Sequence, residues 1–573
     1  MDANAKSAKK PNFMIIVADD LGFSDTSPYG SEIHTPNLQK LSDEGIRMTD
    51  FHTAASCSPT RSMLLSGTDA HIAGIGCMAE RMKKYPHIFE GRPGYEGYLN
   101  FRVAALPEIM QDNGYHTVMA GKWHLGITKE VSPWARGFTK VVTTLPGAGN
   151  HYNHEPQLYD IPEDEQPKGI GLLKGDGLWM REDKFIHGRK DLPEDFYSSN
   201  FFTEEMINYL RTRTDEEREK PFFGYLAFTA PHWPLQAPKQ VIEKYKGWYD
   251  SGPTAHRDRR VQRLIELGLV PEDVIPAPLH TMRETPWDEM TDEQRQYSSR
   301  AMEIYAAMVD IIDVNIGKLR AYLEDIDELD NTFIVFISDN GAEGQLLEAA
   351  PILAGFTMGE IIAKYYDNSL DNLGAFNSFT WYGPQWASAA TAPSRACKSY
   401  TTEGGIRCPC IVRYPPLVQQ PGGVSHTFTT VMDILPTVLE LAGVQHPGDV
   451  FRGRPVAGLR GYSWVPLLGS DNLAVQVYDP ERDVVGWEQL GNAGCRVGNW
   501  KLVMLPPPRG TGDWELYNLS KDPAEMNNLA ESEPDMLYKM VGHYETYYAE
   551  TGMFDAYTMF YDELKKEGVK RWW

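Results

Sequence analysis

Cysteine is scarce in this chain, which has six of them in 573 residues. Their spacing forms no disulfide framework, and Cys408 and Cys410 stand too close together for a zinc pair of the Cys-x2-Cys kind. We expect most of these side chains to be inert buried thiols. Cys57 alone lies in a motif that suggests chemistry.

Long hydrophobic runs are also missing. The first apolar run, residues 13–18, is shorter than the roughly 7–15 residues of a secretory signal core and ends at two aspartates. No stretch approaches the ~18 apolar residues of a membrane span. These absences predict a protein with no membrane partner and a cytoplasmic location.

An excess of positive charge is absent as well, because the formal net charge is −24. A nucleic-acid-binding protein usually carries the opposite sign, so we expect no nucleic-acid partner. An acidic protein that acts on anions needs a local region of positive electrostatic potential around its binding site. A metal ion and a few lysine or arginine side chains gathered in one cleft would supply it.

What the sequence does contain is an alternation of apolar strand-like runs with helical patterns. Residues 12–18, 115–120, 221–228 and 332–337 have the composition of strands, and 292–324 carries a long helical periodicity. This alternation predicts an α/β fold with a large, mostly parallel central sheet flanked by helices.

The pattern changes towards the C-terminus. Short strands within 494–504 and 514–517, followed by a helix at 534–548, predict a smaller C-terminal α+β domain. We therefore divide the chain into a catalytic α/β domain, residues 1–455, and a C-terminal subdomain, residues 456–573.

Two stretches show no regular pattern. They are residues 143–195 and 341–398, and long irregular loops inside a compact domain are usually functional or disordered. Four aromatic residues of the second stretch suggest either core packing or contact with an aromatic leaving group. They are Phe379, Trp381, Tyr382 and Trp386.

Acidic and amide side chains directly follow two of the predicted strands. Asp19 and Asp20 come after the first strand, and Asp339 and Asn340 after the strand at 332–337. Each pair alone is compatible with a solvated turn. Together, at the carboxyl ends of parallel strands, they offer the hard oxygen donors that Ca²⁺ or Mg²⁺ prefers.

Cys57 opens a predicted helix. Pro59 suits the first helical turn, and Arg61 lies one turn beyond Cys57 on the same face. The N–H groups and dipole of such a helix end favour anions. Read without further knowledge, the Cys-x3-Arg spacing is wrong for a loop that cradles phosphate around a thiolate.

Further cations and histidines follow other strand-like segments. Lys122 and His124 lie in Gly-Lys-Trp-His-Leu-Gly, where an extended backbone would place both on one side. His232 is flanked by prolines, and Lys398 competes with two nearby arginines for the same role. Each residue alone is compatible with a surface lysine or a packed histidine.

Taken together, these motifs resemble those of type I sulfatases of the alkaline phosphatase superfamily. The likeness lies in Cys-x-Pro-x-Arg from Cys57, followed by Ser62 and Gly67, and in the motif around Lys122. It is greatest to bacterial-type arylsulfatases without a leader. It implies hydrolysis of aryl and possibly alkyl sulfate monoesters, on a cysteine that a formylglycine-generating enzyme oxidises to formylglycine (3-oxoalanine).

The resemblance also implies a role for each residue. Ca²⁺, or Mg²⁺ in its place, would be held by Asp19, Asp20, Asp339, Asn340 and the modified Cys57. Arg61 would steady the modified side chain and Asp339 would take its proton. Lys122 and Lys398 would bind sulfate oxygens, His232 would protonate the leaving group, and His124 would be the base that restores the aldehyde.

One alternative stays open on the same residues. A phosphonate monoester or phosphodiester hydrolase would use the same scaffold and nucleophile, and its substrates also carry one negative charge. Counting charges therefore does not separate it from a sulfatase.

Overall fold

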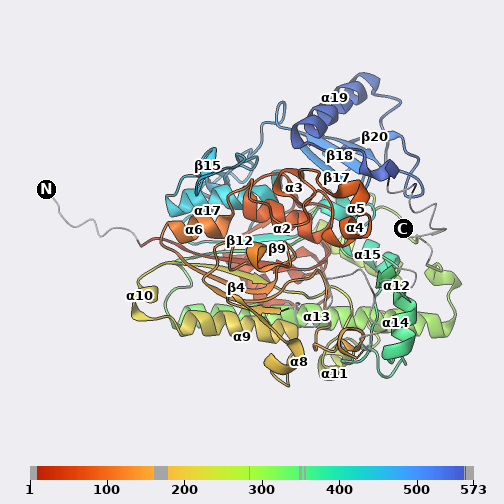
Figure 1. The fold of residues 1–573 in the computed structure, drawn as a ribbon. Coiled ribbons are helices and arrows are strands. Elements are labelled where there is room, and N and C mark those ends of the chain that lie inside the picture. Colours follow the sequence, from red (N-terminus) through yellow and green to blue (C-terminus); the bar gives the residue numbers. More distant parts are fainter. Residues whose placement is uncertain are drawn as a thin grey trace.

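The computed structural model describes residues 9–160, 179–282, 284–347, 351–353, 356–559 and 562. Helices cover both faces of a large central sheet, and a smaller sheet with one long helix lies at one end of the molecule (Figure 1). None of the described helices combines the length and the apolarity of a membrane-crossing segment.

Ten strands form the central sheet. They are β1 (Asn12–Ala18), β2 (Ile46–Met48), β4 (His116–Lys122), β5 (Lys140–Thr144), β6 (Trp179–Arg181), β7 (Lys184–Ile186), β8 (Phe222–Ala227), β9 (Thr332–Ser338), β12 (Cys410–Arg413) and β13 (Gly423–Ser425). Their order is β13-β2-β12-β9-β1-β8-β4-β5-β6-β7, and the five strands from β9 to β5 run parallel. The predicted α/β fold with a mostly parallel central sheet is thereby confirmed.

The sheet is buried on both faces, which explains why its strands are continuously apolar. In β1, Met14 and Ile16 belong to one core cluster, whereas Phe13, Ile15 and Val17 belong to another. Alternate side chains of a strand point to opposite faces, so each cluster marks one helix-covered face of the sheet.

Helices on both sides of the sheet form these covers (Figure 1). The first face carries α9 (Ser198–Arg211) and α13 (Asp292–Asp325), and the second carries α2 (Cys57–Ser66), α6 (Leu106–Asp112) and α17 (Ile434–Ala442). The long helix α13 begins with a capping box, in which the Thr291 side chain accepts a hydrogen bond from the backbone N–H of Gln294.

The smaller unit is an antiparallel sheet in the order β17-β18-β19-β20, packed against one helix. Its elements are β17 (Val485–Gln489), β18 (Asn492–Val497), β19 (Trp500–Met504), β20 (Trp514–Asn518) and α19 (Pro534–Thr551). A smaller C-terminal α+β unit was predicted. The run at 494–504 is a hairpin, turning at Gly498, whose φ of +56° glycine adopts without a steric penalty.

The position of the domain boundary stays a prediction. Trp464, Leu467 and Leu468 follow residue 456 but pack in the same core cluster as Phe13 and Ile15 of β1. The chain therefore continues to contribute to the α/β core for some distance beyond residue 456.

The two stretches predicted to be irregular contain more structure than expected. The first includes β6 and β7, which extend the sheet, although its residues 161–178 lie outside the described part of the chain. The second includes α14 (Met358–Tyr365) and α15 (Pro384–Ala390). Elements this short lack the periodicity that identifies a helix or strand in sequence.

The remaining elements are short, apart from α1 and α12. The helices, with η for 3₁₀ turns, are η1 (Ser27–Tyr29), α1 (Pro36–Glu44), α3 (Ala70–Ala73), α4 (Ala79–Lys84), α5 (Pro86–Phe89), η2 (Lys129–Val131), α7 (Pro156–Tyr159), α8 (Gly188–Asp191), α10 (Asp215–Arg218), α11 (Lys239–Ile242), η4 (Glu243–Tyr245), α12 (Gly252–Glu266), η5 (Trp287–Glu289), α16 (Glu403–Ile406), η6 (Val431–Asp433) and α18 (Val465–Leu468). The strands are β3 (Phe51–His52), β10 (Pro351–Leu353), β11 (Phe356–Thr357), β14 (Thr429–Thr430), β15 (Val450–Phe451) and β16 (Arg454–Pro455).

Candidate active site

The acidic residues after β1 and β9 meet at one edge of the sheet. The last residues of these strands, Ala18 and Ser338, are paired in register, so the residues that follow them emerge side by side. The backbone N–H of Asp20 donates a hydrogen bond of 3.2 Å to Oδ1 of Asp339. The prediction that two distant strand ends converge therefore agrees with the geometry.

Four potential ligand atoms lie together at this edge of the sheet, in a buried cluster that we call the pocket. Carboxylate oxygens of Asp19, Asp20 and Asp339 and the Sγ of Cys57 all lie within 4.8 Å of one another, and all four residues are buried. Asn340 donates from Nδ2 to Oδ1 of Asp20 at 2.7 Å, which leaves its buried Oδ1 without a hydrogen-bond partner. Three clustered carboxylates beside a residue with an unpaired amide oxygen suit a hard divalent cation such as Ca²⁺ or Mg²⁺.

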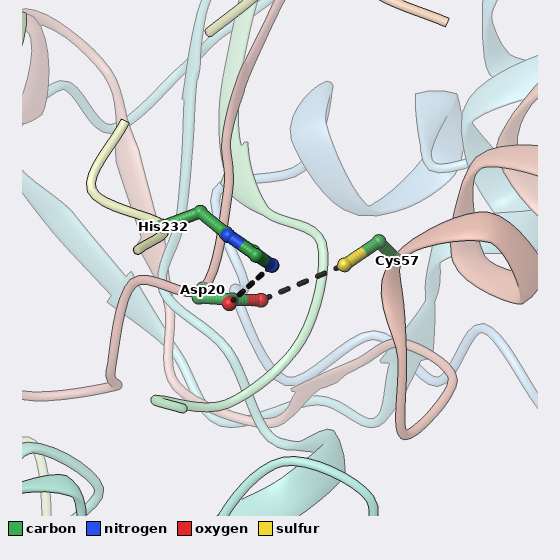
Figure 2. Close-up of side chains that lie close together, drawn as sticks. All are labelled: Asp20, Cys57 and His232. Atoms are coloured by element: carbon green, nitrogen blue, oxygen red, sulfur yellow. Dashed lines mark hydrogen bonds and ion pairs between the residues drawn. The ribbon is translucent and has the colours of Figure 1, made fainter. Parts of the chain in front are cut away.

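Cys57 is the first residue of α2, as predicted, and Ser56 is the N-cap. Its Sγ lies 3.6 Å from Oδ1 of Asp20, towards which the thiol can donate (Figure 2). Burial, together with the Asp339 carboxylate, raises the pKa of the Cys57 thiol well above its usual range. The unmodified side chain is therefore a neutral thiol at neutral pH and a weak nucleophile.

Three cations surround the carboxylates. Arg61 donates to Oδ2 of Asp339 from Nε at 2.9 Å and from Nη2 at 2.7 Å. Lys122, the last residue of β4, donates to both oxygens of Asp19 at 2.8 and 2.7 Å. Lys398 donates to Oδ2 of Asp20 at 2.8 Å. All three predicted cations thus converge on the three predicted acids.

The pKa values of the two neighbouring carboxyl groups, Asp19 and Asp20, are shifted in opposite directions. Burial raises the pKa of Asp19 to about 7, even though Lys122 acts in the opposite direction. Burial would also raise the pKa of Asp20, but Lys398 and His232 outweigh it and hold that pKa below its usual range. A buried carboxylate that binds a proton so readily would be stabilised by another cation beside it.

His232 faces the pocket from the loop after β8. Its Nε2 lies 3.4 Å from Oδ2 of Asp20, and its Nδ1 donates to the backbone carbonyl of Trp233 at 2.8 Å (Figure 2). Burial lowers the pKa of His232 well below its usual range, against the effect of Asp20. Because Nδ1 is engaged by the carbonyl, Nε2 is the nitrogen that can exchange a proton in the pocket.

His124 is placed differently from the prediction. We expected an extended segment with Lys122 and His124 on one side, but the φ of His124 is +59°, in the left-handed region. The alternation of side chains along β4 ends there. The His124 ring turns to Glu80, with Nε2 3.3 Å from Oε1, and no described contact joins it to Cys57.

Sequence reasoning missed two acidic residues near the site. Glu343 lies 3.0 Å from the Nζ of Lys398, which it shares with Asp20. Its place in the Asp-Asn-Gly-Ala-Glu loop, three residues after Asn340, was an available signal. Glu80 lies on the short helix α4, and nothing in its sequence context points to His124.

The four aromatic residues of the second irregular stretch separate into two groups. Tyr382 and Trp386 are buried in the main core, so the packing interpretation applies to them. Phe379 and Trp381 belong to a satellite cluster with Trp233. The Trp233 ring packs against the His232 ring, with 4.5 Å between centroids, and so borders the pocket.

Two family models match parts of this chain. Residues 11–444 match the family model described as Sulfatase, and this match covers more than half of the chain. Residues 397–543 match a second model, described as N-sulphoglucosamine sulphohydrolase, C-terminal.

Individual proteins resemble this chain over most of its length. An uncharacterized sulfatase of Schizosaccharomyces pombe is 52% identical over 550 residues, covering 96% of this chain and 95% of that protein. An arylsulfatase of Klebsiella aerogenes is 36% identical over 465 residues, covering 80% and 92%. The crystal structure of a phosphonate monoester hydrolase of Agrobacterium radiobacter superposes with a TM-score of 0.54, covering 95% and 96%, at 18% identity, which shows a shared fold alone.

Proposed function

Because this chain belongs to the sulfatase family of the alkaline phosphatase superfamily and is a sulfuric ester hydrolase, we propose that its nucleophile is a formylglycine made by oxidation of Cys57. The observation that carries the proposal is the position of Cys57, at a helix N-terminus and within 4.8 Å of three buried carboxylates. A formylglycine-generating enzyme would be the partner that matures the protein.

The proposed modification would replace a poor nucleophile, the neutral thiol of Cys57, with a better one. The thiol of Cys57 is held protonated by burial and by Asp339, so it is poorly suited to attack sulfur. A hydrated aldehyde supplies two hydroxyls on one carbon, one to attack sulfur and one to let the carbon release sulfate by returning to the aldehyde.

A divalent metal ion completes the charge balance in this proposal. Asp19, Asp20, Asp339 and the unpaired Oδ1 of Asn340 would hold it, beside the side chain at position 57. The ion would lower the pKa of the nucleophilic hydroxyl and offset the charge of the sulfate group. We propose Ca²⁺, with Mg²⁺ as the alternative, since oxygen donors serve both.

The cations of the pocket bind and orient the substrate in this scheme. The amino groups of Lys122 and Lys398 lie on the Asp19 side and the Asp20 side of the pocket, from which both could reach sulfate oxygens. Arg61 keeps Asp339 in place through two hydrogen bonds, and Asp339 can accept the proton of the attacking hydroxyl. Fixed cations stabilise the charge that develops on the sulfate group as the ester bond breaks.

The two histidines move protons at separate places. Nε2 of His232 is unprotonated before the substrate binds, because burial lowers its pKa and Nδ1 carries the N–H that faces the Trp233 carbonyl. His232 would take up a proton at Nε2 when the anionic ester binds and pass it to the leaving oxygen. The adjacent Trp233 ring would contact an aromatic leaving group, which favours aryl over alkyl sulfates as substrates. His124 would act as the base that restores the aldehyde.

The proposal is tested at position 57. We expect mass analysis of the peptide containing Cys57 to show an aldehyde in place of the thiol. Cys57→Ala should lower turnover of an aryl sulfate by roughly 10⁵-fold, because the covalent route is lost. Its far-ultraviolet circular dichroism should be unchanged. Full activity of the variant would end the proposal.

The phosphonate monoester alternative is tested with a matched pair of substrates. A sulfate monoester and a phosphonate monoester of the same phenol differ only in the group attacked. We expect kcat/KM to be larger for the sulfate. A larger value for the phosphonate would assign this chain to the alternative reaction, on a fold that both activities share.

A further inference from the structure

The imidazole of His124 lies between two unlike environments. Its Nε2 faces the carboxylate of Glu80, at 3.3 Å from Oε1 and 3.5 Å from Oε2. Its Nδ1 is buried and has no hydrogen-bond partner. The His124 side chain is only 8% exposed, whereas that of Glu80 is 47% exposed, so a buried ring is paired with a partly exposed carboxylate.

This arrangement dictates where the proton of a neutral imidazole resides. A carboxylate only accepts hydrogen bonds, so Nε2 carries the N–H that faces Glu80. The buried Nδ1 then holds the lone pair and is the basic nitrogen. An unpaired buried acceptor is costly, which suggests that Nδ1 has a partner that the unmodified side chains do not supply.

We infer that Glu80 is the positioning residue for His124, fixing the tautomer in which Nδ1 is the proton acceptor in the turnover of the sulfate ester. This inference deepens the proposed function and depends on it for the base role of His124. It assigns Glu80 no contact with the substrate.

The backbone holds the ring in the orientation that the inference needs. The N–H of His124 donates to the carbonyl of Leu145 at 3.1 Å, beyond the end of β5. Gly147 packs against the ring so closely that a Cβ there would lie 2.4 Å from its Cε1 and 2.5 Å from its Nε2. With the ring held in place, the choice of tautomer depends on the groups that face its two nitrogens.

The surrounding charges agree with this role. Burial lowers the pKa of His124, and Lys122 and Arg61 on the pocket side lower it further, while Glu80 acts to raise it. Glu80 is thus the one charged group among these that keeps the ring basic. Without it, His124 would be both misoriented and a weaker base.

The first test reads the tautomer directly and does not require a modified Cys57. In full-length protein labelled with ¹⁵N-histidine, the His124 signals are identified as those missing from His124→Asn. Solid-state NMR should show a protonated Nε2 and a bare Nδ1 in the wild type. In Glu80→Ala, Nδ1 should become protonated in a substantial share of molecules. A protonated Nδ1 in the wild type, or no change in the variant, would overturn the inference.

The second test measures turnover of an aryl sulfate. Glu80→Ala should lower kcat by roughly 10- to 100-fold, with KM within about threefold, as for other residues that orient a reactive histidine. Glu80→Gln should recover part of the loss, because its amide oxygen accepts the same hydrogen bond. The control is Glu90→Ala, which removes an exposed acid directly after the next helix, α5, and should leave kcat unchanged.

The outcomes separate the two proposals. A tautomer change in Glu80→Ala with an unmodified Cys57 would support the positioning of His124 while contradicting the proposed nucleophile. An active, modified enzyme whose kcat does not respond to Glu80→Ala would overturn the role of Glu80 and leave the proposed function standing.

Discussion

In the part of the chain that the structure describes, three sets of acidic, cysteine or histidine side chains lie close enough together to hold a metal ion, and two of the sets share Asp20 and Cys57. We compare the larger of these two with the third set, because the two differ in the partners of their charged side chains. The pocket group is Asp19, Asp20, Asp339 and Cys57; the other, which we name the seam group, is Asp50, His52 and Glu403. The seam group lies where the α/β body meets the C-terminal sheet, since Lys501 of β19 donates to Glu403 at 2.6 Å.

Both carboxylates of the seam group form ion pairs with neighbouring side chains. The two oxygens of Glu403 face Lys501 and His52, at 2.6 and 2.9 Å. Asp50 accepts two hydrogen bonds from the guanidinium of Arg496, at 2.9 and 2.7 Å. In the pocket, by contrast, Asn340 Oδ1 has no partner and the pKa of Asp19 is raised to about 7 by burial. The unpaired amide oxygen and the raised pKa of Asp19 support the proposal of a metal ion at the pocket group, and the seam group offers neither feature.

The largest expected effect comes from the pocket group. Asp339→Asn should lower turnover by on the order of 10³-fold, because it weakens both the metal site and the anchor of Arg61. Added Ca²⁺ should stabilise the wild type by about 2.7 kcal/mol at a concentration 100 times Kd, measured by thermal unfolding, and should not stabilise the variant.

The seam group supplies the control for that experiment. Glu403→Gln should keep the stabilisation by Ca²⁺. A calcium response that survives in Asp339→Asn but disappears in Glu403→Gln would reverse the comparison and place the metal at the seam.

The next effect concerns stability alone. Glu403→Gln leaves the fully buried Lys501 without one of its two carboxylate partners, which should cost about 3–5 kcal/mol of unfolding free energy in urea. The matched control is Glu550→Gln at the half-exposed pair with Arg460, where the loss should be below about 1 kcal/mol. Equal losses in the two variants would mean that the seam contributes no more than a surface ion pair.

The smallest effect depends on pH and lies at a second contact between body and C-terminal sheet. His71 is bound by Asp69 at 2.9 Å and by Glu488 of β17 at 3.1 Å. Burial acts to lower the pKa of His71, but these two acids outweigh it and raise the pKa to about 9. A folded-state pKa above the unfolded value stabilises the protein at low pH, fully below about 6.5, and this stability is lost as pH rises through about 9.

This prediction is tested by comparing the unfolding free energies of the wild type and His71→Gln at several pH values. The unfolding free energy of the wild type minus that of His71→Gln should shrink by about 3 kcal/mol between pH 6 and 9.5, because each tenfold gain in proton affinity on folding is worth about 1.4 kcal/mol. A difference that stays constant over this range would show that His71 is not charged in the folded protein.

The pocket could be read from sequence to the extent that strand ends determine it. Asp19 and Asp339 were predicted to meet because apolar strands of a parallel sheet end at a common edge, and register pairing of β1 with β9 brings them together. Cys57 was placed at a helix start by the proline and the helical pattern that follow it.

What could not be read depends on contacts between distant segments. Nothing local indicates the positive φ of His124, a residue that contacts Gly147 and Leu145 from a distant part of the chain. Glu80 meets His124 only through tertiary structure. The seam group could not be predicted from the sequence either, because His52 and Glu403 are far apart along the chain and meet only in the folded protein.

The helix α2 also limits the time at which its first residue can react. All ten of its residues, Cys57 among them, are buried in the finished fold, beneath strand ends and loops contributed by residues as late as Lys398. Under the proposal that another enzyme oxidises Cys57, that enzyme would have to reach the side chain before these later segments fold over it. Under the same proposal, the time available for oxidation of Cys57 is set by how fast the rest of the chain folds.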